Sequence, residues 1–257
     1  MLLAIDIGNS NIVVGMVENG TLLHKARFAT DRIKTSDQYW VELKSALALF
    51  DLSPKTIEAA IISSVVPPVL NSVRSAVLKM TGVEPMIVGP GMKTGLNILA
   101  DHPAQIGSDL IAAAVAAVHV YPKPLLVVDM GTATTISALD RNGAFLGGSI
   151  CPGIKISAEA LTGRTAQLPA ISLEAPKKAI GRNTIDSMKS GLMLGAAAML
   201  DGMIDRMESE LGEKVTVVAT GGISRYVVPM CRREITLDSD LLLKGLIILY
   251  ENNRKAD

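Results

Sequence analysis

Short apolar runs and longer amphipathic stretches alternate along this chain, which is typical of an α/β protein. The short runs are rich in Val, Ile and Leu and end at Gly, Asn or Asp, so we expect them to form strands. Strands are predicted at Leu2–Ile7, Ile12–Val17, Thr21–Phe28, Ala59–Ser63, Pro85–Val88, Leu125–Asp129, Thr135–Asp140, Ala144–Ile150 and Val215–Ala219. Helices are predicted at Ser36–Phe50, from Pro67 to about Met80, and at Ser108–His119, Ile154–Gly163 and Asn183–Leu211.

The order of these elements repeats. A strand ending in an Asp turn, a second strand, a hairpin turn and a third strand are followed by helices, and the series restarts at Pro124. The hairpin turns are Glu18-Asn19-Gly20 and Arg141-Asn142-Gly143. This internal repeat predicts two duplicated halves, each a mixed sheet flanked by helices. No flexible linker or low-complexity segment separates them, so the boundary is expected near Tyr121-Pro122 as a joint between packed domains.

Composition narrows the classes of function. The 257 residues carry 25 basic and 25 acidic side chains, so the formal net charge is zero and there is no footprint for nucleic acid or a membrane surface. The longest apolar run, Leu110–Val120, is about half of the roughly 20 residues that a membrane span needs. Two cysteines and three histidines suggest neither a disulfide framework nor a metal-ligand spacing. The apolar start, Met1–Ile5, is interpreted as a strand and not a signal peptide, which predicts a soluble cytoplasmic protein.

Two acidic turns of the same design are the main candidate chemistry. The first is Asp6-Ile7-Gly8-Asn9-Ser10-Asn11, and the second is Asp129-Met130-Gly131-Thr132 followed by Ala133-Thr134-Thr135. In each, a strand delivers a carboxylate that can hold a hydrated cation, and Gly lets backbone N–H groups approach an anion. One such turn is also ordinary Asx-turn chemistry. The presence of two such turns, each followed by a strand, favours the interpretation that the two halves of the chain bind one nucleotide between them.

Other candidates have competing interpretations. Ser108-Asp109 opens a predicted helix, where the helix dipole alone favours a carboxylate by roughly 0.3–1 kcal/mol. Thr184 suits the start of the helix that follows it equally well as a helix cap. Thr220-Gly221-Gly222 is either a plain strand-to-helix turn or a place where backbone approaches a ligand. Asp129 is different, because a carboxylate after the apolar run Leu125–Val128 would be costly to bury without a cation or donors.

Motifs along nearly the full length, in the same order, resemble those of the type III pantothenate kinases, which belong to the acetate kinase, sugar kinase, Hsp70 and actin superfamily. The matching stretches are Asp6–Asn11, Thr30-Asp31-Arg32 with Lys34-Thr35, Ser63–Pro67, Val88–Ile98, Asp129–Thr135, Pro152-Gly153-Ile154, Ser157–Leu161, Leu168-Pro169, Ile180–Thr184, Ser187-Met188, Ser190-Gly191 and Ala219–Gly222. The resemblance implies an α/β fold of two duplicated ribonuclease H-like (actin-like ATPase) domains. The N-terminal domain, 1–117, would carry the first phosphate loop and the acceptor-activating Asp. The C-terminal domain, 118–257, would carry the second loop, the adenosine turn and the dimer helices.

The resemblance also implies an activity, its cofactors and its site residues. The family phosphorylates pantothenate to 4'-phosphopantothenate, the first step of coenzyme A biosynthesis, with ATP, Mg²⁺ and a monovalent cation (K⁺ or NH₄⁺). It forms a homodimer with the acceptor site near the subunit interface. Asp109 aligns with the catalytic carboxylate that accepts the proton of the attacking hydroxyl, Asp129 with the monovalent-cation ligand, and Asp6 lies near the Mg²⁺-bound phosphates. ATP and its phosphates would be bound by Asp6, Ile7, Gly8, Asn9, Ser10, Asn11, Ile12, Val13, Thr132, Gly221 and Gly222. The substrate would be bound by Ala100, Gly107, Ser108, Asp109, Leu110 and Thr184, the last reaching across the dimer.

The chain departs from the family pattern in the acceptor half. The family has Tyr where this chain has Ala100, Arg where it has Leu110, and Ala where it has Ser108. An Arg can clamp a substrate carboxylate with two hydrogen bonds, and Leu replaces none of that. Three hypotheses therefore stay open: a pantothenate kinase with a diverged acceptor pocket, a kinase of another small alcohol on the same fold, or a non-catalytic nucleotide-binding regulatory protein. Retention of Asp109 argues against the third.

Overall fold

A computed structural model describes residues 1–254 as two compact units. Unit 1 comprises Met1–Leu96, Asp101–His119 and residues 240–254, and unit 2 comprises Asn97–Ala100 and Val120–Ser239. The chain changes unit at His119, close to the expected joint. It departs from a simple division into 1–117 and 118–257 because a short segment before Asp101 packs with unit 2 and the C-terminal helix packs with unit 1.

The sheet of unit 1 has five strands in the order β3-β2-β1-β4-β5. They are β1 (Leu2–Ile7), β2 (Asn11–Glu18), β3 (Thr21–Ala29), β4 (Ala59–Ser64) and β5 (Met86–Ile87). β1 pairs antiparallel with β2 and parallel with β4, so it is the central strand of a mixed sheet. Its residues face the two sides alternately, so Asp6 and Ile7 point to opposite faces.

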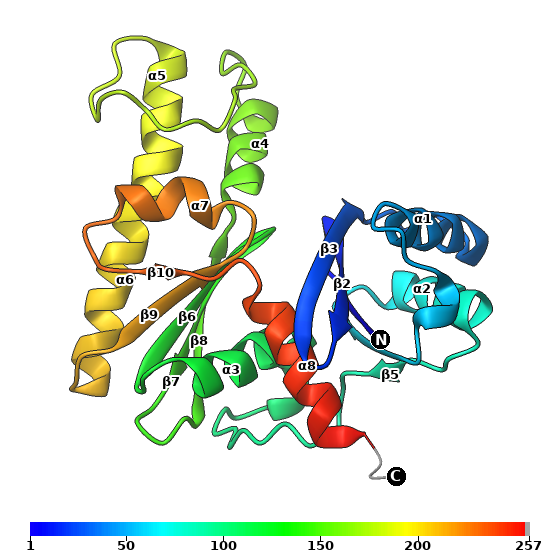
Figure 1. The fold of residues 1–257 in the computed structure, drawn as a ribbon. Helices are drawn as coiled ribbons and strands as arrows, with labels where there is room; N and C mark the ends of the chain where they lie inside the picture. Colours follow the sequence, from blue (N-terminus) through cyan, green and yellow to red (C-terminus); the bar gives the residue numbers. More distant parts are fainter. Residues whose placement is uncertain (255–257) are drawn as a thin grey trace. The chain divides into compact units, whose positions relative to one another are not determined.

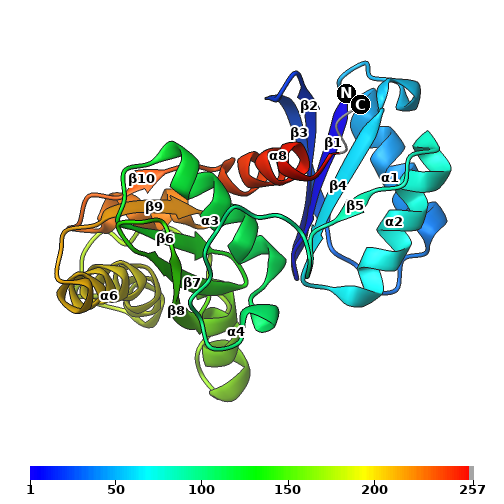
Figure 2. The same cartoon turned by 90° about the horizontal axis from the view of Figure 1, so that it is seen from below.

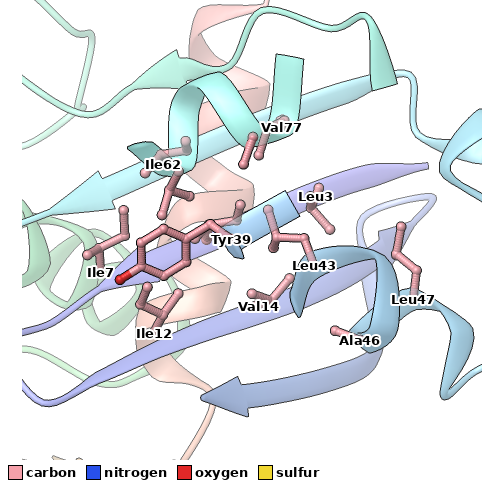
Figure 3. Packing of buried hydrophobic residues seen from close by; sticks show 14 of the residues in the cluster. Leu3, Ile7, Ile12, Val14, Tyr39, Leu43, Ala46, Leu47, Ile62 and Val77 are labelled. Carbon is pink, nitrogen blue, oxygen red and sulfur yellow. The ribbon is translucent and has the colours of Figure 1, made fainter. Parts of the chain in front are cut away.

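Helices cover both faces of this sheet (Figure 2). The helices of unit 1 are α1 (Ser36–Ala48), α2 (Pro67–Thr81), α3 (Ser108–Val120) and α8 (Leu241–Asn253), with short 3₁₀ turns η1 (Pro54–Thr56) and η2 (Pro103–Gln105). Of these, α3 packs on α8. α1 and α2 close one face, where the buried ring of Tyr39 lies among Ile7, Ile12 and Ile62 (Figure 3). Thr35 caps α1 through a capping box with Gln38. The opposite face is contacted by α8, which packs against β1 and β4.

The sequence pattern did not predict α8, and its packing explains why the end of the chain belongs to unit 1. A Cβ added at Gly245 would lie 1.8 Å from the carbonyl oxygen of Ala112, so α8 touches α3 backbone to backbone. On the sheet side, a Cβ at Gly15 would meet the Leu243 side chain at 3.1 Å. Small residues at both contacts let α8 lie between α3 and the sheet.

Unit 2 repeats the topology of unit 1. Its strands are β6 (Leu125–Met130), β7 (Ala133–Leu139), β8 (Phe145–Pro152), β9 (Thr216–Thr220) and β10 (Thr236–Leu237), in the order β10-β9-β6-β7-β8. β6 pairs antiparallel with β7 and parallel with β9, as β1 does with β2 and β4. The predicted duplication of a mixed sheet flanked by helices is therefore confirmed.

Helices pack on one face of the sheet of unit 2 and continue beyond its edge (Figure 1). They are α4 (Ile154–Arg164), α5 (Thr184–Lys189), the π-helical stretch η3 (Ser190–Leu194), α6 (Gly195–Leu211) and α7 (Ser224–Val227), with a 3₁₀ turn η4 (Val228–Met230). Leu200 and Ile204 of α6 join Leu126 and Val128 of β6 in one buried cluster. Within residues 1–254, no helix combines the length and the apolar character needed to cross a membrane.

Candidate functional site

The first acidic turn is a tight, solvent-facing bend at the end of β1. The Gly8 N–H donates to the Asn11 carbonyl at 3.0 Å, and a Cβ at Gly8 would lie 3.2 Å from the same oxygen. Asn9, Ser10 and Asn11 are exposed, whereas Asp6 is half-buried on the strand. The bend therefore presents polar groups to solvent directly beyond a strand-borne carboxylate, as a phosphate-binding loop requires.

The segment after β3 fixes this turn from the side. The Thr30 hydroxyl donates to the Gly8 carbonyl at 2.6 Å, and the Thr30 N–H donates to the Ser10 carbonyl at 3.1 Å. The Arg32 guanidinium donates to Asn9 Oδ1 at 3.2 Å. The sequence did not predict these hydrogen bonds to the turn, although Thr30 and Arg32 lie in one of the motifs that match the family. A turn held at three points is preorganised for an anion.

Three of the predicted nucleotide-binding residues are apolar and lie on strands, not in the exposed turn. Ile7 and Ile12 are completely buried in the core of unit 1, and Val13 is half-buried on β2. Ile7 and Ile12 therefore hold the strands that carry the turn, and their side chains are not available to a ligand.

Asp109 lies in the first turn of α3 with its carboxylate folded back over Gly107. Its Oδ1 accepts from the Leu110 N–H at 2.8 Å. A Cβ added at Gly107 would lie 2.3 Å from that same Oδ1. The absence of a side chain at Gly107 therefore leaves the space that the Asp109 carboxylate occupies. This packing explains why a glycine is needed here, independently of the family motif.

The environment of Asp109 suits a proton acceptor. Burial raises the pKa of the Asp109 carboxyl above its ordinary value, and the backbone N–H groups of Leu110 and of Asp109 itself only partly oppose that rise. A general base works best when its pKa lies near the working pH. A helix cap alone would not need a desolvated carboxylate.

Replacing Gly107 by Ala is expected to lower kcat about a hundredfold, because the new methyl group displaces the Asp109 carboxylate by about an ångström or more. The atom it meets is the end of a side chain, so folding should survive. The measurements are kcat, the dissociation constant for ATP and the melting temperature. Gly89→Ala is the matched control, since a Cβ there meets no atom within 4 Å. Parent-like kcat in Gly107→Ala would contradict the role given to this geometry.

In unit 2 two further turns pack against the second acidic turn. Asp129 is half-buried on β6 and is paired in register with Thr220 of β9. Gly221 has a φ of 90°, and a Cβ there would lie 2.6 Å from Asp129 Oδ1 and from the Met130 carbonyl. A Cβ at Gly153 would lie 2.2 Å from the Thr132 carbonyl. Only glycine fits at both places, so these turns pack backbone to backbone at one end of the sheet.

Gly153 was missed as a site residue, although Pro152-Gly153-Ile154 is among the stretches that resemble the family. The signal available in the sequence was a glycine at the junction of a strand and a helix. The structure gives its purpose, because it lets the chain entering α4 lie directly on the turn that carries Thr132.

A buried hydroxyl oxygen lies beside Asp129. Thr135 is directly opposite Asp129 in the antiparallel pairing of β6 with β7, so the two side chains share one face. The Thr135 Oγ1 is buried and has no hydrogen-bond partner within residues 1–254. A carboxylate beside an unsatisfied hydroxyl oxygen is the donor set that a hard cation takes. In the described part of the chain, no group of three or more His, Cys, Asp or Glu residues is arranged to hold a metal.

The remaining predicted acceptor residues divide between the units. Gly107, Ser108, Asp109 and Leu110 lie together in unit 1, and Ala100 and Thr184 belong to unit 2. Ala100 is half-buried and follows a short pairing in which the Leu99 N–H donates to the Phe145 carbonyl at 2.8 Å.

Asn183, and not Thr184, caps α5. The Asn183 Oδ1 accepts from the Asp186 N–H at 2.9 Å. Thr184 is exposed at the edge of an open pocket of about 720 Å³, which is also lined by Arg182 and Ser187. The capping interpretation of Thr184 is therefore wrong, and its hydroxyl is left for another partner.

Comparison with known proteins decides the family. A model of the type III pantothenate kinase family matches residues 2–206. The type III pantothenate kinase of Exiguobacterium sp. (strain ATCC BAA-1283 / AT1b) is 45% identical over 255 residues, which cover 99% of this chain and 100% of that protein. The chain belongs to the type III pantothenate kinase family. It is therefore a phosphotransferase of the kinase class, and membership implies ATP as the phosphoryl donor.

Solved structures agree with this family's fold. A Campylobacter jejuni protein named as a Baf family transcriptional activator superposes with a TM-score of 0.60 at 20% identity, covering 98% of each chain. The activator of 2-hydroxyisocaproyl-CoA dehydratase from Clostridium difficile superposes with a TM-score of 0.58 at 14% identity, covering 97% of this chain and 93% of that one. Together with the repeated sheet topology, these similarities confirm the predicted α/β fold of two duplicated halves, each a mixed sheet flanked by helices.

Proposed function

We propose that this member of the type III pantothenate kinase family transfers the γ-phosphoryl group of ATP to the hydroxyl of pantothenate, in the cytoplasm. The observation that carries the proposal is the Asp109 carboxylate, held over Gly107 in a desolvated place at the start of α3. Asp109 accepts the hydroxyl proton as the oxygen attacks phosphorus. Phosphoryl transfer needs little more from the protein than this positioning and the neutralisation of charge.

The two acidic turns supply the neutralisation. The exposed polar side chains from Asn9 to Asn11 bind the phosphates, together with backbone N–H groups of the turn other than that of Gly8, and Thr132 contributes a hydroxyl from the second turn. Asp6 would hold Mg²⁺ near the phosphates, and that ion would offset the charge of the transferred group. Gly221 and Gly222 let the backbone approach the adenosine.

Asp129 is proposed to hold a monovalent cation such as K⁺ or NH₄⁺. The support is the buried Thr135 hydroxyl oxygen on the same face, together with the Met130 carbonyl that Gly221 approaches. A weakly hydrated cation among such oxygens offsets phosphate charge without demanding the strict geometry of Mg²⁺.

A homodimer is also part of the proposal. Thr184 lies on a solvent-facing surface of unit 2 where large apolar side chains are exposed, among them Ile180 at 83% and Ile185 at 47%. Exposed apolar side chains grouped in this way are typical of an interface. A second copy covering them would bring Thr184 toward an acceptor site, as the family resemblance implies.

A second candidate is phosphorylation of another small alcohol, favoured by Ala100 and Leu110. Reverting both positions, Ala100→Tyr with Leu110→Arg, is expected to raise kcat/KM for pantothenate by one to two decades. The restored contact to the substrate carboxylate is charge-assisted and worth roughly 1.5–3 kcal/mol. ADP release with pantothenate, with Mg²⁺ and K⁺ present, is the measurement. Good parent activity that the reversion leaves unchanged would show that the carboxylate is bound in another way.

The acceptor class is tested by screening small alcohols for ADP release with the parent protein. Pantothenate as the best acceptor would support the first proposal, and a neutral alcohol as the best acceptor would favour the second. Thermal stabilisation by nucleotide without turnover of any alcohol would contradict both and leave a non-catalytic nucleotide-binding protein.

A further inference from the structure

The Ser108 side chain connects the start of α3 to the end of β4. Its hydroxyl donates to the Ser64 carbonyl at 3.1 Å and accepts from the Ser64 N–H at 3.1 Å. The Ser63 hydroxyl lies 3.0 Å from the same oxygen. A serine hydroxyl has one proton and two acceptor positions. Because the Ser108 proton goes to Ser64, Ser63 is the donor in the third contact, and the hydrogen-bonding capacity of Ser108 is fully used.

Through Ser63, the hydrogen bonds of Ser108 reach the neighbour of β1, the strand that carries the first acidic turn. Ser63 is paired in register with Asp6 across the parallel strands β4 and β1, so their side chains lie on the same face of the sheet. Ser63 is completely buried and Ser108 is half-buried. The chain of contacts therefore runs from β1 through β4 to the first turn of α3, where Asp109 is the next residue.

The contribution of the Ser108 hydroxyl is clear from what an alanine at that position would lack. Alanine would leave the Ser64 peptide groups without these partners at the point where the chain leaves the sheet. A buried backbone group left without a hydrogen bond is costly, so the serine both satisfies the strand end and holds the helix start.

We infer that Ser63 and Ser108 form a positioning pair that holds the first turn of α3 on β4, and with it the Asp109 carboxylate, for proton transfer. The inference rests on the proposed function. Ser108 was expected to bind the substrate, but its hydroxyl is engaged by Ser63 and Ser64, so the pair acts through Asp109. Removing it should therefore change the chemical step more than the binding of ATP.

The test compares Ser108→Ala, Ser63→Ala and Ser108→Thr with the parent. Both alanine variants are expected to lose about 10- to 100-fold in kcat, with KM for ATP within about twofold of the parent. Ser108→Thr keeps the hydroxyl and is expected to retain most of the activity. As the turn loosens, water reaches Asp109 and lowers its raised pKa, so the acidic limb of kcat against pH should move to lower pH in both alanine variants.

Ser45→Ala is the matched control, because the Ser45 hydroxyl donates to the Val41 carbonyl within α1 and lies in the same unit. Parent-like kcat and an unmoved acidic limb in folded Ser108→Ala and Ser63→Ala would overturn the inference, as would an equal loss in Ser45→Ala.

Hydrogen exchange gives a readout that does not need activity. The Ser64 amide and the amides of the first turn of α3 should exchange faster in Ser108→Ala, and unchanged exchange would also overturn it. A parent without kinase activity would refute the proposed function and leave the exchange result to decide on the link.

Discussion

Asp109→Asn is expected to lose phosphoryl transfer while ATP binding survives. Asn is nearly isosteric and can still accept the hydrogen bond from the Leu110 N–H, so the first turn of α3 should keep its shape. What disappears is the group that accepts the hydroxyl proton, which should cost about 10²–10⁴-fold in kcat. ADP release measures the loss, and the dissociation constant for ATP, from calorimetry or thermal shift, is the control.

The same residue predicts how the parent depends on pH. Asp109 must be ionised to accept a proton, and burial raises its pKa. The rate should therefore fall, as pH is lowered, around a pKa above the ordinary aspartate value, and not only in the range of an exposed carboxyl. Turnover of Asp109→Asn within threefold of the parent would mean that Asp109 only favours the start of the helix.

Asp129→Ala is expected to weaken the use of ATP and to remove any dependence on K⁺ or NH₄⁺. Losing a cation beside the phosphates should cost of the order of ten- to a hundredfold in kcat/KM for ATP, or about 1.4–2.7 kcal/mol of transition-state stabilisation. Rates measured in K⁺, NH₄⁺ and Na⁺ buffers at constant ionic strength separate this effect from a general loss of stability.

Thr135→Val tests the same proposed cation site more specifically than Asp129→Ala. It removes the buried hydroxyl oxygen and nearly keeps the volume, and no hydrogen bond within residues 1–254 is lost with it. The K⁺ concentration for half-maximal rate should therefore rise without a loss of melting temperature. Equal parent rates in Na⁺ and K⁺ would show that the cation role is wrong for this protein.

Much of the architecture could be predicted because local chemistry and long-range packing agree. The first hairpin follows from Asn19-Gly20, whose φ values of 50° and 76° are both in the region that these two residue types tolerate. The start of α2 follows from Pro67, whose fixed φ suits a first helical turn. The duplication of the halves follows from the repeated order of such signals.

Other features depend on contacts that no local pattern contains. The helix α8 was not predicted, and its packing on α3, where Gly245 meets Ala112, joins residues far apart in the chain. The link from Ser63 to Ser108 was invisible for the same reason, since it depends on where the start of α3 meets β4. The sequence could indicate Asp109 as a candidate through the family motif. It could not show that Gly107 makes room for the carboxylate.

The most direct test of the account is transfer of labelled phosphate from γ-labelled ATP to pantothenate by the parent protein, with Mg²⁺ and K⁺ present. The account predicts one labelled 4'-phosphopantothenate for each ADP formed, with Asp109→Asn bound to ATP but forming essentially none. Label released only as inorganic phosphate, or transferred equally well by Asp109→Asn, would contradict it.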